Sequence, residues 1–214
     1  MKQSITFSFL IFALAGIASC SSNIAISTPE SNYSWWTQWL DEPICKPPCW
    51  ANITPGVTSM DEALSILGKM PEVKITYKDQ QGVDWRFNQT ITDSGTLRAS
   101  QNGIISVVVL GNSNDKKLLL ETVAGSYGNP AYVKPYDCRI GMCSTVLVYP
   151  DSGMLLNVFL EDAGDKSNHR LRIESDTAVE YVIFFPPGLE NFERMAEYQE
   201  YDLLMEWHGY GEYP

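Results

Sequence analysis

The chain has 214 residues, of which 26 are acidic and 15 are basic, and its formal net charge at pH 7 is −11. Phosphate backbones and anionic lipid headgroups repel a surface of this sign, so the composition argues against a nucleic-acid partner and against electrostatic docking to a membrane. The length is enough for one large domain or two small ones.

The first segment, residues 1–19, has the pattern of a signal peptide. A lysine precedes residues 5–15 (ITFSFLIFALA), which are apolar apart from small hydroxyl residues. This run is too short to span a bilayer, which takes about 20 apolar residues. Residues 17–20 (IASC) resemble the lipobox of bacterial lipoproteins, and the resemblance implies cleavage before Cys20 and lipidation of its sulfur. The alternative is ordinary secretory cleavage after Ala18.

Cleavage before Cys20 leaves 195 residues with a net charge of −12, because the removed segment holds one lysine and no acids. Two or more acyl chains anchor a protein stably, so the lipid alone would hold it at the membrane. We therefore expect an extracytoplasmic protein that is lipid-anchored to a bacterial cell membrane; Ser21 beside the anchor would suit an outer membrane. Small polar residues follow the anchor, which predicts a flexible tether over residues 20–32 and a single domain over residues 33–214.

The four remaining cysteines fall into two local pairs, Cys45 with Cys49 and Cys138 with Cys143. An even number of cysteines in an oxidising compartment favours disulfides, and the sequence leaves three connectivities open. A zinc site built from all four thiolates is the alternative, although the two pairs lie far apart in the sequence. We expect disulfides, no metal ion and no cofactor.

An aromatic cluster that contains Trp35, Trp36 and Trp39 is predicted to begin the ordered domain. On a helix these rings would share one face with Leu40, because residues three and four apart are neighbours. Such a stripe is usually part of a core. A stacking platform for sugars and an anchor at the membrane surface are the functional alternatives.

The first strong structural pattern is a helix followed by a meander. Ser59 and Glu62 form a capping-box signature, and the helix is expected to end at a left-handed Gly68 before Pro71. Alternating apolar residues and turn signals then predict four strands, at residues 73–77, 85–92, 96–100 and 104–110.

A second stretch repeats this pattern. Asn114 or Asp115 is expected to cap a helix that runs through Ala124, with strands at residues 145–149, 154–161 and 179–185. The repetition predicts an α+β fold in which two helix-plus-antiparallel-meander halves form one domain. The alternative is that this common pattern, a helix followed by a glycine, a proline and a strand, occurs twice by chance.

The end of the chain is predicted to hold an amphipathic helix over residues 189–204 and an aromatic, glycine-rich tail over residues 205–214. Free aromatic rings in water are costly, so the tail is expected to dock on the domain. A groove for a ligand or partner that includes Trp207 and Tyr210 is the alternative.

Motifs for enzymatic chemistry are missing from the sequence. The two histidines, His169 and His208, lie outside any triad pattern, and the sequence has no nucleophile elbow, zinc-peptidase helix or nucleotide-binding loop. We therefore predict no catalytic residues. The rival hypothesis is an extracytoplasmic enzyme such as a glycan hydrolase that uses an unrecognised pair of carboxylates.

Three stretches carry a resemblance, namely the Cys49-Trp50 pair, residues 53–58 (ITPGVT) and residues 207–213 (WHGYGEY). Together they resemble a group of uncharacterised lipoproteins from Chloroflexi-type bacteria, a likeness that covers most of the mature chain and implies no known activity. More remotely, the glycine and threonine of residues 53–58, with Leu67-Gly68 and Pro71, are similar to the helix motif of SmpA/OmlA-type lipoproteins, α+β domains that support outer-membrane protein assembly. In this chain the distance from Gly56 to Gly68 is one residue longer than in the motif of those lipoproteins, and Met70 interrupts their usual Gly-x-Pro. The likeness therefore bears on fold more than on function.

These observations predict a lipid-anchored cell-envelope protein that binds a partner or gives structural and assembly support. An envelope protein or a glycan is the expected partner, besides the membrane reached through the lipid. Aromatic clustering without catalytic motifs makes five residues the candidates for binding: Trp35, Trp36, Trp39, Trp207 and Tyr210.

Overall fold

The computed structural model describes residues 35–41, 43–88, 93–112, 117–139, 142–161, 171–195 and 204–213. The chain divides into two units, residues 1–31 and 32–214, and every described residue belongs to the second. Within these described ranges, no helix combines the length and the hydropathy needed to cross a bilayer.

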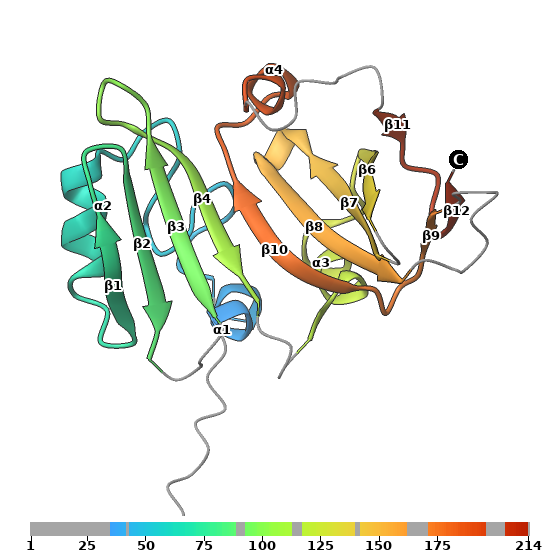
Figure 1. The fold of residues 1–214 in the computed structure, drawn as a ribbon, viewed down its shortest axis with the longest axis horizontal. Helices are drawn as coiled ribbons and strands as arrows, with labels where there is room; N and C mark the ends of the chain where they lie inside the picture. The colour runs from blue at the N-terminus through green and yellow to red at the C-terminus, as the bar shows by residue number, and fades with distance from the viewer. Residues whose placement is uncertain are drawn as a thin grey trace, which may run out of the picture. The chain divides into compact units, whose positions relative to one another are not determined.

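Short helices and a large antiparallel sheet make up the described unit (Figure 1). The helices are α1 (Trp35–Asp41), α2 (Met60–Leu67), α3 (Leu120–Tyr127) and α4 (Leu189–Glu193), with a 3-10 turn η1 (Pro150–Ser152). The strands are β1 (Val73–Lys78), β2 (Gly82–Phe87), β3 (Ser94–Ala99), β4 (Ile105–Gly111), β5 (Leu118–Leu119), β6 (Tyr132–Arg139), β7 (Met142–Tyr149), β8 (Met154–Glu161), β9 (Leu171–Ile173), β10 (Ala178–Phe184), β11 (Met205–Glu206) and β12 (Gly211–Tyr213). The α+β class is therefore confirmed.

The ten-stranded sheet has the order β1-β2-β3-β4-β10-β8-β7-β6-β11, and β5 pairs with β10 beside this path. Strands β9 and β12 form a separate two-stranded sheet. The predicted strands correspond to β1, β2, β3, β4, β7, β8 and β10, although residues 89–92, the end of the second prediction, lie outside the described residues. Ser94 and Gly95 carry a turn signal in the sequence, but they pair with β2 as part of β3. Their pairing with β2 keeps the chain extended there, which local turn propensity does not reveal.

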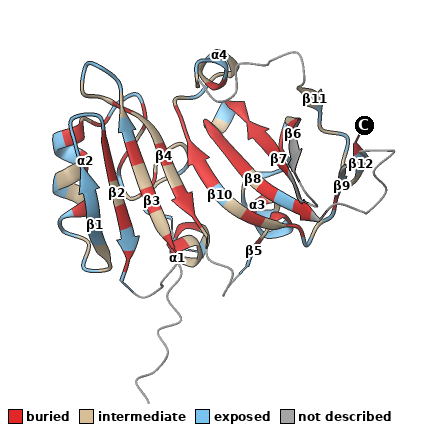
Figure 2. Ribbon diagram, viewed as in Figure 1, coloured by how far each residue is buried: buried red, intermediate tan, exposed pale blue. Residues whose placement is uncertain are grey.

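The central strands are buried on both faces, as the red along β10, β8 and β7 in Figure 2 shows. On β7, Leu147 and Tyr149 belong to a large hydrophobic cluster, whereas Val146 and Val148 belong to a smaller one. Successive residues of a strand point to opposite faces, so the two clusters lie on opposite sides of the sheet. The large cluster includes residues of α1, α2 and α3, and the smaller one includes Phe192 of α4.

Helix α2 begins as the sequence predicts. The Ser59 side chain accepts a hydrogen bond from the Glu62 backbone, and the Glu62 carboxylate accepts one from the Ser59 N–H at 2.9 Å. The expected left-handed Gly68 is wrong, because this residue has φ −67°. The chain instead leaves the helix through right-handed turns, in which the N–H groups of Lys69 and Met70 bond to carbonyls three residues earlier.

Helix α3 begins later than predicted. Leu118 and Leu119 form β5 opposite Val179 and Ala178 of β10, so the chain is extended up to the first residue of the helix. The N-cap is Leu119, which makes no side-chain capping bond. The predicted caps, Asn114 and Asp115, lie outside the described residues.

The helix predicted over residues 189–204 is wrong in length. Helix α4 ends at Glu193, and the Met195 N–H bonds to the Phe192 carbonyl in a tighter turn. Residues 196–203 lie outside the described part of the chain. The aromatic tail docks on the domain as expected, because β11 pairs with β6, β12 pairs with β9, and Tyr213 is buried.

Candidate functional site

A pocket of about 360 Å³ is formed by α1, the loop that contains the cysteine pair, and the C-terminal end of α2. We call it the α1 pocket. Its apolar lining comes from Trp35, Trp39, Ile44, Trp50, Ile66 and Met70, and its polar lining includes Gln38, Asn52, Lys69 and Glu72. Three elements that are separate in the sequence therefore meet around a mainly apolar space.

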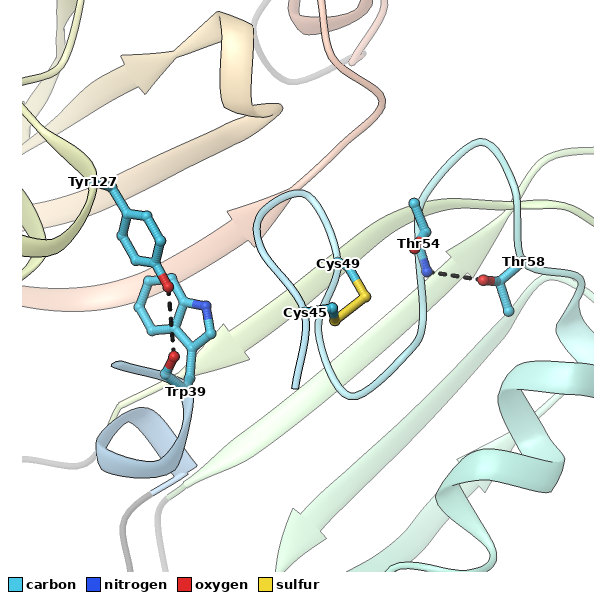
Figure 3. The surroundings of a disulfide bond; sticks show 6 residues. All are labelled: Trp39, Cys45, Cys49, Thr54, Thr58 and Tyr127. Atoms are coloured by element: carbon cyan, nitrogen blue, oxygen red, sulfur yellow. Dashed lines mark hydrogen bonds between the residues drawn. A yellow bond between two sulfur atoms is a disulfide. The ribbon is translucent and has the colours of Figure 1, made fainter. Parts of the chain in front are cut away.

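Helix α1 supplies two indole rings to this pocket. Trp35 and Trp39 are one helical turn apart, with ring centroids 6.0 Å apart, and both are buried in the large cluster. The Trp35 Nε1 donates a hydrogen bond to the Gly111 carbonyl at 3.0 Å. The Trp39 ring stacks on Tyr127 of α3 at 5.1 Å, and the Tyr127 hydroxyl donates to the Trp39 carbonyl at 3.5 Å (Figure 3).

The opposite wall is the loop closed by a disulfide between Cys45 and Cys49 (Figure 3), whose Cα atoms are 5.6 Å apart. Directly after it, Trp50 and Ile53 exchange two backbone hydrogen bonds. The Trp50 ring stacks on Trp85 of β2 with centroids 5.5 Å apart, which fixes the loop against the sheet. The disulfide expected at this pair is confirmed, and its connectivity is the local one.

The second cysteine pair lies at the β6–β7 end of the sheet. Cys138 and Cys143 are opposite each other in the strand register, and their side chains lie outside the described structure. Because Cys45 and Cys49 are bonded to each other, a bridge between the two pairs and a zinc site with four thiolates are both wrong. Within the described residues, no group of three or more His, Cys, Asp or Glu side chains is placed to hold a metal ion.

The structure separates the five predicted binding residues into two regions. Trp35 and Trp39 line the α1 pocket, and Trp36 is partly buried against the same cluster. Trp207 and Tyr210 form a different aromatic group in the tail, with ring centroids 5.5 Å apart in an edge-to-face arrangement. No ring contact joins the two groups within the described part of the chain.

Three important lining residues were missed by the sequence analysis, namely Trp50, Ile66 and Met70. Ile66 lies off the main apolar stripe of α2, and Met70 lies one turn beyond it, so the two form a second short apolar strip. The four-residue spacing of Ile66 and Met70 was the signal in the sequence from which this strip could have been predicted. Trp50 follows a predicted disulfide, which does not indicate the direction of its ring.

Glu72 is the one carboxylate among the lining residues of the α1 pocket that the structure describes. The glycan hydrolase hypothesis requires two carboxylates that share a cleft, and Asp93 is the one buried acid among the described residues. No family model matches the chain, and no curated protein and no solved structure matches it either. Function is therefore inferred from the geometry of the pocket.

Proposed function

We propose that this chain is a lipid-anchored protein of the bacterial cell envelope that binds an apolar group of another envelope component in the α1 pocket. The observation that carries the proposal is the pocket lining, in which three indole rings, Ile44, Ile66 and Met70 face one space. Its volume of about 360 Å³ lies within the range of small-molecule sites.

Burial of an apolar ligand group would supply the binding free energy. Each methylene removed from water contributes about 0.8 kcal/mol, so a chain of about eight methylenes would contribute about 6 kcal/mol before the entropy costs of binding. The polar lining residues, Gln38, Asn52, Lys69 and Glu72, would orient the polar end of the ligand.

Attachment to the membrane through a lipid on Cys20 is part of this proposal. It is supported by the lipobox-like residues 17–20 and by the likeness to bacterial lipoproteins. The Cys45–Cys49 disulfide agrees with an oxidising compartment outside the cytoplasm. The strongly acidic composition leaves the lipid as the route to the membrane.

We also propose that the domain consists of two helix-plus-meander halves. Support comes from the strand order, in which β1 to β4 are contiguous, as are β6, β7, β8 and β10. A helix precedes each set, α2 in the first and α3 in the second. The two sets join through antiparallel pairing of β4 with β10.

Binding in the α1 pocket can be tested by titrating the mature chain carrying Cys20→Ser, which removes the anchor, with a dansyl-labelled fatty acid. Ile66→Asp places a charge in the pocket wall, whereas Ser65→Asp places the same charge on an exposed neighbour in α2. We expect dansyl fluorescence to increase with the parent and with Ser65→Asp, and to be lost with Ile66→Asp. Equal binding by the two aspartate variants would refute the assignment.

The anchor is tested separately by mass spectrometry of the native protein. A mature N-terminus at Cys20 with a diacylglyceryl mass increment is expected, and Cys20→Ser should abolish that increment and release the protein from membranes. An unmodified Cys20 would refute the lipid anchor without affecting the pocket.

A further inference from the structure

The tail exposes one tyrosine at a bend of the backbone. Tyr210 is 44% exposed, and it lies between Gly209 at φ 106° and Gly211 at φ 136°. Side chains other than glycine rarely adopt such φ values, so the loop around Tyr210 depends on both glycines. A Cβ atom at either glycine would meet nothing within 4 Å, which shows that the backbone conformation, and not crowding, requires them.

Hydrogen bonds and ring contacts within the tail hold this loop. The buried Tyr213 hydroxyl donates to the Gly209 carbonyl at 2.7 Å and accepts from the His208 N–H at 3.2 Å. Trp207 stacks on Tyr213 with centroids 5.8 Å apart, and it supports Tyr210 edge-to-face at 5.5 Å. Contacts within the tail therefore already position the Tyr210 ring in the absence of a ligand.

A recess of about 260 Å³ adjoins this ring, lined by Arg172, Ile173, Glu174, Ser175, Tyr210 and Gly211. Pairing of β12 with β9 brings the two segments together, with Gly211 opposite Ile173. The Arg172 Nε lies 2.8 Å from the Glu174 Oε1, and the two side chains are 68% and 53% exposed. This contact uses one nitrogen and one oxygen, so both groups retain further hydrogen-bonding capacity toward the recess.

An exposed aromatic ring beside charged and hydroxyl side chains favours one class of ligand. A pyranose ring has an apolar C–H face that packs on an aromatic ring, and its hydroxyl groups both donate and accept hydrogen bonds. An arginine beside a carboxylate and a serine satisfies such hydroxyls, whereas a purely apolar ligand would leave those groups unpaired. Burial, followed by the charge of Glu121, raises the pKa of Tyr210. The negative charges of Glu121 and of Glu174 in the recess disfavour an anionic ligand.

We infer that this recess binds a neutral carbohydrate, with one pyranose ring stacked on Tyr210 and its hydroxyl groups held by Arg172 and Glu174. The site shares no lining residue with the α1 pocket. Either site can therefore be present without the other.

The test is calorimetric titration of the full mature chain carrying Cys20→Ser with chitohexaose and with cellohexaose. At least one oligosaccharide should bind, Tyr210→Ala should weaken binding by about tenfold or more, and Tyr210→Phe should retain it because the ring is kept. Tyr77→Ala is the matched control, because Tyr77 is another exposed tyrosine, on edge strand β1. Arg172→Ala tests the same recess from strand β9, and it should also weaken binding.

Binding of chitohexaose alone would assign the site to amino-sugar glycans such as those of a cell wall, and binding of both oligosaccharides would assign it to pyranose rings generally. Failure of both oligosaccharides to bind would overturn the inference, as would unchanged binding by both Tyr210→Ala and Arg172→Ala. Titration of Tyr210→Ala with the dansyl-labelled fatty acid reports on the α1 pocket, so the two proposals fail independently.

Discussion

The indole nitrogen of Trp35 donates a hydrogen bond to the carbonyl oxygen of Gly111, 3.0 Å away and 76 residues further along the chain. This bond ties α1 to the end of β4. Helix α1 has only seven residues, and a helix of that length is not stable in water by itself. Its position therefore depends on tertiary contacts, among them the buried Trp35 bond and the bond from the Tyr127 hydroxyl to the Trp39 carbonyl. Trp39 on the same helix differs, because its Nε1 is buried without a partner among the described residues.

Replacement of each indole by phenylalanine should separate these two roles. Trp35→Phe removes the donor and breaks a buried hydrogen bond, which costs about 0.5–1.5 kcal/mol in addition to lost packing. Trp39→Phe removes a similar amount of packing and breaks no side-chain hydrogen bond within the described structure. Urea denaturation should therefore show the larger loss of unfolding free energy for Trp35→Phe. Equal losses would show that the hydrogen bond contributes nothing beyond packing.

Two glycines should respond to alanine in opposite directions. A Cβ atom at Gly95 in β3 would overlap the indole ring of Trp85, which is itself fixed by stacking on Trp50. Gly95→Ala should lower the unfolding free energy by about 1–3 kcal/mol or more through overpacking. In α3, a Cβ atom at Gly125 would meet no atom within 4 Å. Gly125→Ala should therefore raise the unfolding free energy by about 0.5–1 kcal/mol through helix propensity. Thermal unfolding of the two variants checks both signs.

The capping box of α2 should contribute a pH-dependent stability. Hydrogen bonds from the Ser59 backbone and side chain lower the pKa of Glu62 below its ordinary value of 4.5. Because the folded pKa is the lower one, this stabilisation is present above pH 4.5 and is lost as the pH falls through the folded pKa. Glu62→Gln keeps an acceptor for the box but cannot titrate. The difference in melting temperature between wild type and Glu62→Gln should therefore shrink as the pH is lowered, and a constant difference would contradict this prediction.

Much of the fold follows from local patterns. The capping box of α2 and the apolar runs of β7, β8 and β10 are encoded within a few residues, so the sequence predicts them well. The extended residues Leu118 and Leu119 depend on pairing with β10, which is remote in sequence, so local propensity gives them incorrectly. Gly68 differs from its prediction because right-handed turns continue past the end of α2.

The candidate site was predictable only in part for the same reason. Trp35, Trp39 and Cys45 stand out in the sequence because they belong to clusters of like residues. The pocket also requires Trp50, whose direction is set by stacking on Trp85 of β2, and Ile66, which contributes from α2. The meeting of these side chains is a tertiary property, and no spacing within one segment reports it.

Removal of the disulfide should affect both the stability of the domain and ligand binding in the α1 pocket, because Cys45 closes the loop and also lines the pocket. The bonded cysteines are four residues apart, and a loop this short gives about 2 kcal/mol on the chain-entropy model. Cys45→Ser with Cys49→Ser should therefore lower the melting temperature by about 4–8 °C. The same double variant should bind the dansyl-labelled fatty acid more weakly, since the loop would no longer hold Trp50 firmly against Trp85. An unchanged affinity alongside the lower melting temperature would mean that stacking on Trp85 positions the pocket wall without help from the disulfide.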